Sequence, residues 1–177
     1  MRKLGVFIAT TFIAIILSGL YGIIHDQVTY SISPEYFTKF KYEQFGLDPG
    51  RFGGHRQTVA LIGFLATWWM GIFIGILLGL TGLIFSNYKI MRKAIMNGIK
   101  VTLVTAILFA IFGFLWGKYY LVKAGVDWSL PDGLVDRNHF IIVGSIHNFS
   151  YLGGIAGILF GIIYMIRRRF FMRPNFS

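Results

Sequence analysis

Four histidines are the residues of this chain best suited to chemistry, because imidazole binds transition metals and changes its charge near neutral pH. Asp26 directly follows the first of them, His25. Imidazole nitrogens and carboxylate oxygens together form the donor set of many divalent transition-metal sites. The candidate metal ligands are therefore His25, Asp26, His55 and His147, with Glu35 and His139 as additional candidates.

The spacing of these residues does not by itself define a metal site. The chain has no HExxH or HxxxH motif. On one helix, His139 and His147 would lie about 12 Å apart along the axis and about 80° apart in projection, too far to chelate one ion alone. The alternative is that the histidines lie at the interface and hydrogen-bond to loop carbonyls or carboxylates. The absence of cysteine excludes disulfides, Cys-ligated zinc and iron–sulfur clusters.

His147 is the most informative of the four because it lies about two turns inside an apolar segment. An ionisable side chain at that depth usually faces the interior of a helix bundle or a wet cavity. The sequence therefore predicts that His25, Asp26 and His147 meet in one polar pocket under an outer loop. Glu35 and His55 complete this pocket if the loop folds back. A structural hydrogen bond between helices is the alternative role for His147.

Four long apolar segments must position these side chains. They cover residues 4–24, 59–85, 101–117 and 140–166 and contain no Asp, Glu, Lys or Arg. About 20 helical residues cross a hydrocarbon core about 30 Å thick. The expected fold is an all-α membrane protein, a bundle of four transmembrane helices that forms a single domain over residues 1–177. Because no acidic residue falls inside the segments, a proton-coupled transporter built on a carboxylate relay is disfavoured.

The charge distribution predicts the orientation of the bundle. The N-terminus, the loop at 86–100 and the tail at 167–177 carry ten basic residues and no acidic one, whereas the loops at 25–58 and 118–139 carry seven of each. Basic residues accumulate in cytoplasmic loops, so both termini are expected in the cytoplasm and the two balanced loops outside. The net charge of +10 is thereby explained by topology, and no nucleic-acid partner is expected.

Glycines recur four residues apart in the second and fourth segments. When residues 71–80 are aligned with residues 153–162, three glycines coincide, which suggests two similar helical hairpins. Glycines at this spacing form a groove that lets another helix approach closely. The grooves predict tight packing, either within the chain or between the copies of a homo-oligomer.

Three short elements carry a resemblance to known proteins: HDQVT at 25–29, EYFT at 35–38 and ATWW at 66–69. They resemble the corresponding elements of a family of bacterial multi-pass membrane proteins, and the resemblance covers mainly residues 20–80. It implies a bacterial cytoplasmic (inner) membrane, with the lipid bilayer as the main partner. It implies no activity, because none is known for the family.

These features favour a non-enzymatic integral membrane protein with a polar cluster of histidines and carboxylates on its outer face, and they leave its biochemical role open. One alternative is a membrane-embedded metal-binding or redox subunit or enzyme that uses a divalent transition metal. The other is a small transporter or channel assembled as an oligomer through the glycine grooves.

Overall fold

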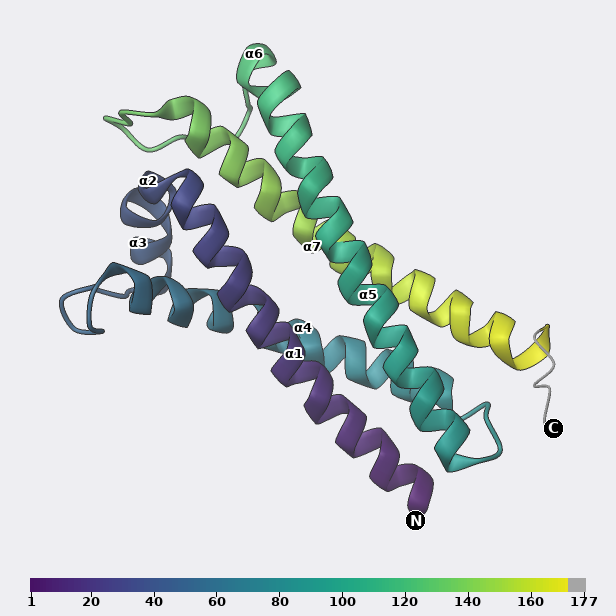
Figure 1. Ribbon diagram of the computed structural model, residues 1–177. Helices are drawn as coiled ribbons and strands as arrows, with labels where there is room; N and C mark the ends of the chain where they lie inside the picture. Colours follow the sequence, from purple (N-terminus) through teal and green to yellow (C-terminus); the bar gives the residue numbers. More distant parts are fainter. Residues whose placement is uncertain (172–177) are drawn as a thin grey trace.

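The computed structural model describes residues 1–171, and all regular secondary structure in them is helical (Figure 1). Four helices are long and apolar enough to cross a membrane. They are α1 (Arg2–Ile32), α4 (His55–Gly82), α5 (Tyr88–Trp116) and α7 (Arg137–Phe170). The predicted fold class, an all-α protein with four such helices, is confirmed. The end of the predicted basic tail, residues 172–177, lies outside the described residues.

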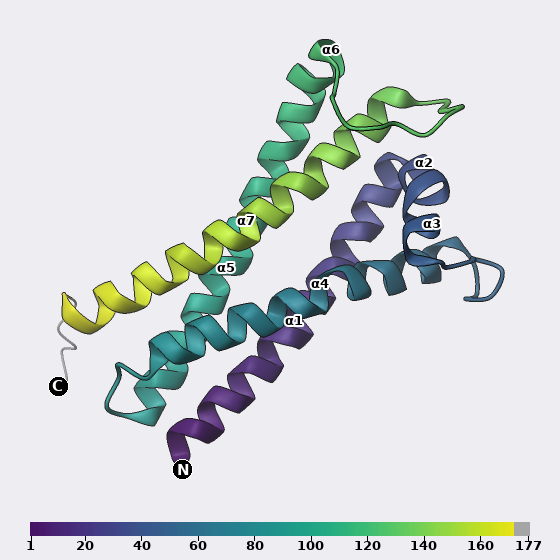
Figure 2. The same cartoon turned by 180° about the vertical axis from the view of Figure 1, so that it is seen from behind.

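The long helices form two antiparallel pairs: α1 packs along α4, and α5 packs along α7 (Figures 1 and 2). Contact between the two pairs is much less extensive. One end of the bundle holds both described chain ends and the α4–α5 connection. The other end holds three short helices, α2 (Pro34–Tyr36), α3 (Tyr42–Phe45) and α6 (Val122–Ala124). This arrangement agrees with the sidedness expected from the charges.

Glycines set the closest approach within each pair. A Cβ atom built on Gly75 would lie 2.6 Å from the Cα atom of Thr11, and one built on Gly157 would lie 2.7 Å from the Cα atom of Thr102. Both distances are far below an ordinary carbon–carbon contact, so the predicted close-packing role of these glycines is confirmed. Helices of the same chain fill both grooves. An oligomer, which stays a prediction, would therefore need other surfaces.

Helix α1 extends well past the predicted boundary at residue 24 and ends at Ile32. His25 and Asp26 therefore lie inside the helix, and Asp26 is only 2% exposed. The prediction that no carboxylate is buried in a membrane-spanning helix is wrong. The first polar residues were taken as the end of the crossing, whereas they face the other helix pair. The argument against a carboxylate relay no longer holds.

The connection between α1 and α4 folds back over this end of the bundle. It runs through α2, the π-helical turn η1 (Phe37–Lys41) and α3. Gly46 follows with a φ angle of 64°, a left-handed conformation that glycine adopts at little cost. Phe37 and Tyr36 are buried in a hydrophobic cluster with residues of α4 and α7, which anchors the loop above the site. The connection after α5 is shorter and continues through the π-helical turn η2 (Gly117–Leu121) into α6.

Candidate functional site

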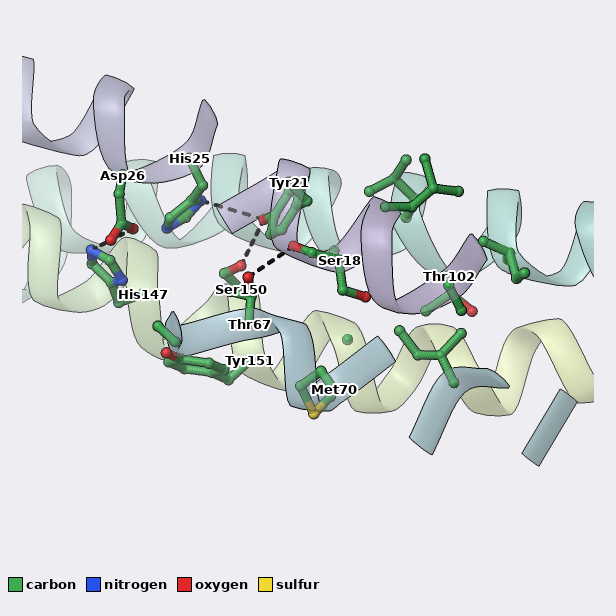
Figure 3. A pocket seen from close by; sticks show the side chains of 18 residues that line it. Ser18, Tyr21, His25, Asp26, Thr67, Met70, Thr102, His147, Ser150 and Tyr151 are labelled. Carbon is green, nitrogen blue, oxygen red and sulfur yellow. Dashed lines mark hydrogen bonds and ion pairs between the residues drawn. The ribbon is translucent and has the colours of Figure 1, made fainter. Parts of the chain in front are cut away.

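His25, Asp26 and His147 come together where α1 meets α7. Each offers one potential ligand atom, and these atoms all lie within 4.8 Å of one another. The Nε2 atom of His147 is 3.9 Å from Oδ1 of Asp26, and the two imidazole rings meet edge to face with centroids 4.8 Å apart. Figure 3 shows the side chains of Asp26 and His147 pointing toward each other. We call these three residues the polar cluster.

Two residues of the polar cluster are buried, His25 is partly buried, and the cluster lacks internal hydrogen bonds. Asp26 is 2% exposed and His147 is 4% exposed. Four buried side-chain atoms in residues 1–171 have no hydrogen-bond partner, and three of them belong to the cluster: His25 Nε2, Asp26 Oδ2 and His147 Nε2. Such atoms are rare in native proteins because each one loses its solvation without compensation. Three of them at one point indicate that the cluster is built around something that satisfies all three.

Neighbouring side chains hold the imidazole rings in place. The hydroxyl oxygen of Tyr21 lies 2.6 Å from Ser150 Oγ and 3.4 Å from His25 Nδ1. The ring of Tyr36 stacks on His147, with centroids 4.9 Å apart and planes 14° from parallel. Contacts of this kind restrict the rotamers of a histidine and decide which nitrogen faces the site.

Lys41 is a component of the site that the sequence did not reveal. It was counted among the balanced charges of the outer loop, yet it is only 5% exposed. Its ammonium nitrogen lies 5.5–5.9 Å from the ring centroids of Phe45, Phe40 and Tyr36. Burial lowers the pKa of Lys41, and the nearby carboxyl of Asp26 acts in the opposite direction. The aromatic residues flanking Lys41 in sequence were the available signal that it turns inward.

His55 and His139 do not join the group of ligand atoms formed by the polar cluster. The Nδ1 atom of His55 is 3.0 Å from the hydroxyl oxygen of Tyr42, and the two rings stack. The Nδ1 atom of His139 is 2.6 Å from Oδ2 of Asp136, and both side chains are about half exposed. His139 therefore bonds to a carboxylate, as in the alternative that the sequence left open, whereas His55 pairs with a tyrosine hydroxyl.

Glu35 also lies outside the polar cluster and joins the two helix pairs instead. Its two carboxylate oxygens accept hydrogen bonds from the backbone N–H groups of Val135, at 2.9 Å, and Asp136, at 2.7 Å. Lys39 forms an ion pair with the same carboxylate at 3.6 Å. The two backbone hydrogen bonds are the main reason that the pKa of Glu35 is lowered. Glu35 thus fastens the loop that covers the polar cluster to the segment before α7.

A cavity of about 70 Å³ adjoins the polar cluster and continues toward the centre of the bundle (Figure 3). Besides the polar cluster, apolar residues such as Met70 line the cavity, and six residues supply hydroxyl groups: Ser18, Tyr21, Thr67, Thr102, Ser150 and Tyr151. A water molecule needs about 10–15 Å³ of such space. The cavity is therefore large enough for several waters or for a small ligand beside the polar cluster.

Two imidazoles and one carboxylate form a donor set that suits divalent first-row transition metals. Three protein ligands also leave part of the coordination sphere of an ion open. No protein-family model, no curated protein and no solved structure matches the chain.

Proposed function

We propose that this chain is a membrane-embedded metal-binding protein in which His25, Asp26 and His147 hold one divalent transition-metal ion. Two observations carry the proposal: His25, Asp26 and His147 each offer a ligand atom within 4.8 Å of the others, and each also has a buried polar atom without a hydrogen-bond partner. One cation between them satisfies all three atoms and neutralises the buried carboxylate. Buried charges in proteins are otherwise paired.

Metal binding requires the ligand atoms to move closer together. Ligand atoms bound to one ion at about 2.0–2.2 Å lie about 2.9–3.4 Å apart in tetrahedral or octahedral arrangements. The separation of 3.9 Å between His147 Nε2 and Asp26 Oδ1 must therefore shorten by about 0.5–1 Å. A pair at the 4.8 Å limit of the group must shorten by about 1.4–1.9 Å.

The hydrogen bonds around His25 fit a metal ligand. Coordination through Nε2 requires the proton of the neutral imidazole to be on Nδ1. In that tautomer, Nδ1–H donates to the hydroxyl oxygen of Tyr21, and the Tyr21 hydroxyl donates to Ser150 Oγ, which agrees with both observed distances. Metal-binding histidines characteristically donate their second N–H group to a fixed acceptor.

An incomplete protein ligand set favours a metal that takes part in chemistry. Structural zinc sites are usually closed by four protein ligands, whereas catalytic sites keep a position for water or substrate. The 70 Å³ cavity beside the polar cluster provides space at such a position. The geometry thus supports the metal-binding or redox subunit or enzyme over the purely structural role.

The proposal places the protein in a bacterial cytoplasmic membrane, with both termini in the cytoplasm and the polar cluster toward the outer face. Two features support this orientation: the basic residues are concentrated in the termini and the 86–100 loop, and both described chain ends lie at the same end of the bundle. Lys and Arg in short loops are retained on the cytoplasmic side during insertion.

Metal analysis of protein purified in detergent tests the function. We expect about one equivalent of Zn, Cu, Fe or Mn per chain, and a loss of that metal in His25→Ala and His147→Ala. His139→Ala is the matched control, because His139 is half exposed and bonds to Asp136. Folded wild-type protein that takes up none of these metals would overturn the proposal.

A second candidate function is proton or cation transport, and the specific observation in its favour is the burial of two ionisable residues of opposite type, Asp26 and Lys41. Ionisable residues of this kind mark proton and ion pathways in membrane proteins. Flux measurements in liposomes decide it. Pumping or leakage that Asp26→Asn abolishes, in protein without bound metal, would favour transport over the metal centre.

A further inference from the structure

A long apolar groove lies between α1 and α5, the first helices of the two pairs. Its volume is about 630 Å³. Many of the lining residues have large, exposed aliphatic side chains, such as Ile24, which is 65% exposed, and Ile111, which is 53% exposed. In a membrane these residues face the acyl chains. The groove is therefore a lateral opening of the bundle toward lipid.

The groove reaches the polar cluster. Tyr21 and His25 line both the groove and the inner cavity, together with Leu17 and Leu103. His25 is also one of the residues whose buried nitrogen has no hydrogen-bond partner. Apart from Thr29, these two are the polar residues of the groove. The groove is thus apolar along most of its length and becomes polar where Tyr21 and His25 line it.

We propose that this groove binds the apolar chain of a single-chain membrane amphiphile and brings its oxygen-bearing head group to the polar cluster. The proposal deepens the proposed function and depends on it, since the head group is taken to be the substrate or ligand of the metal centre. A lateral opening lets such a molecule enter from the bilayer without passing through water.

The dimensions select one chain with a small head group. Along α1 the lining runs from Leu17 to Ile32, which corresponds to about 22 Å at 1.5 Å per residue. This is shorter than the hydrocarbon core of about 30 Å, so the groove is long enough for one acyl chain but does not cross the core. A phospholipid head group is charged and bulky and belongs at the membrane surface, whereas a small head group can reach partly buried His25. The volume is in the range of pockets for small molecules, about 300–1,000 Å³.

The charges select the head group. A divalent ion together with Lys41 outweighs the single carboxylate of Asp26, so the site attracts an oxygen atom with negative or partial negative charge. A fatty-acid carboxylate carries a full negative charge, whereas a quinone carbonyl carries only a partial one. The occupant of the groove is therefore a fatty acid.

Photolabelling of the metal-containing protein in lipid nanodiscs tests the proposal. The probe is palmitic acid with a diazirine in the middle of its chain, and labelled peptides are located by mass spectrometry. We expect saturable labelling of the groove residues on α1 and α5. Competition by palmitic acid supports the proposal, and competition by decyl-ubiquinone alone would overturn the choice of a fatty acid. A phosphatidylcholine that carries the same diazirine chain should label lipid-facing residues without saturation.

A blocked groove provides the comparison. Ala110 is a small residue of the lining, and Ala110→Trp fills the groove with an indole ring, so we expect about a tenfold loss of labelling. Leu108→Trp is the control, because Leu108 on the same helix is exposed to lipid and does not line the groove. If Ala110→Trp does not fold, Ala110→Phe and the saturation of the wild-type signal still decide the question.

The outcomes separate this inference from the proposed function. If labelling saturates in wild-type protein and is lost in Ala110→Trp while the metal content stays unchanged, both the proposed ligand of the groove and the proposed metal centre are supported. Labelling that never saturates in metal-loaded protein, or that equals the phosphatidylcholine pattern, means that bulk lipid fills the groove and overturns this inference alone. Absence of metal from the wild-type protein overturns the proposed function and, with it, the role assigned to the head group.

Discussion

Replacing Tyr21 with phenylalanine removes the hydroxyl group that orients His25 and should weaken metal binding without unfolding the bundle. The Tyr21 hydroxyl oxygen is 2.6 Å from Ser150 Oγ, a short O–H···O distance, and 3.4 Å from His25 Nδ1, which is at the long limit for a hydrogen bond. Partners of metal-binding histidines typically contribute about 10- to 100-fold to affinity. Because the bond to His25 is long, we expect the lower value, about tenfold, equivalent to about 1.4 kcal/mol.

The assay is a competition titration in detergent, in which a chromophoric chelator of known affinity withdraws the metal at fixed pH. Tyr151→Phe is the matched control, because Tyr151 lines the same cavity and makes no hydrogen bond to the polar cluster among the described residues. Circular dichroism confirms that both variants stay helical. Equal affinity of Tyr21→Phe and wild-type protein, or an equal loss in Tyr151→Phe, would refute the assigned tautomer and its role.

Three further predictions concern packing and charge. Gly157→Leu should lower the melting temperature in detergent, because overpacking costs about 1–3 kcal/mol or more and the new side chain would start 2.7 Å from the Thr102 backbone. Gly5→Leu is the control and should leave the melting temperature unchanged, because nothing lies within 4 Å of its new Cβ atom. Lys41→Met should tighten metal binding, since it removes a cation near Asp26. In wild-type protein the metal affinity should rise with pH, because the buried lysine, whose pKa is lowered, then loses its proton. Equal metal affinities of Lys41→Met and wild-type protein would show that Lys41 is too far from the site to affect binding. Glu35→Gln should loosen the loop over the site, measured as faster hydrogen exchange at Val135 and Asp136, while Glu43→Gln serves as control. The pKa of Glu35 is lowered in the folded protein, so its stabilising effect is present above the ordinary glutamate pKa and is lost as the pH falls through the folded value; exchange rates unchanged in Glu35→Gln would contradict the fastening role.

Most of the fold could be predicted because the bilayer imposes simple demands on a sequence. Long apolar segments free of charge must form helices, since no other backbone arrangement satisfies their N–H and C=O groups in lipid. The glycines at 75 and 157 were predictable for a similar reason, because small residues at a spacing of four favour close helix packing in membranes.

The boundaries of the site were harder to predict because they depend on tertiary contacts. Helix α1 is apolar around its whole circumference over most of its length, so the sequence contains no stripe that identifies its buried face. Asp26 is buried next to His147 of α7, and Lys41 is buried among aromatic rings of its own loop. Neither contact is encoded by local spacing. His55 was taken as a candidate ligand because it directly precedes the second apolar segment on the same side as the other histidines, whereas its ring pairs with Tyr42.

The most direct test of the metal centre is X-ray absorption spectroscopy of the loaded protein at the edge of its bound metal. We expect nitrogen and oxygen ligands at about 2.0–2.2 Å and the outer-shell scattering of two imidazole rings. The metal that remains bound in His147→Ala should show the scattering of one ring. A spectrum without imidazole scattering in protein that holds metal would contradict the account, because the ion would then be bound somewhere other than at His25, Asp26 and His147.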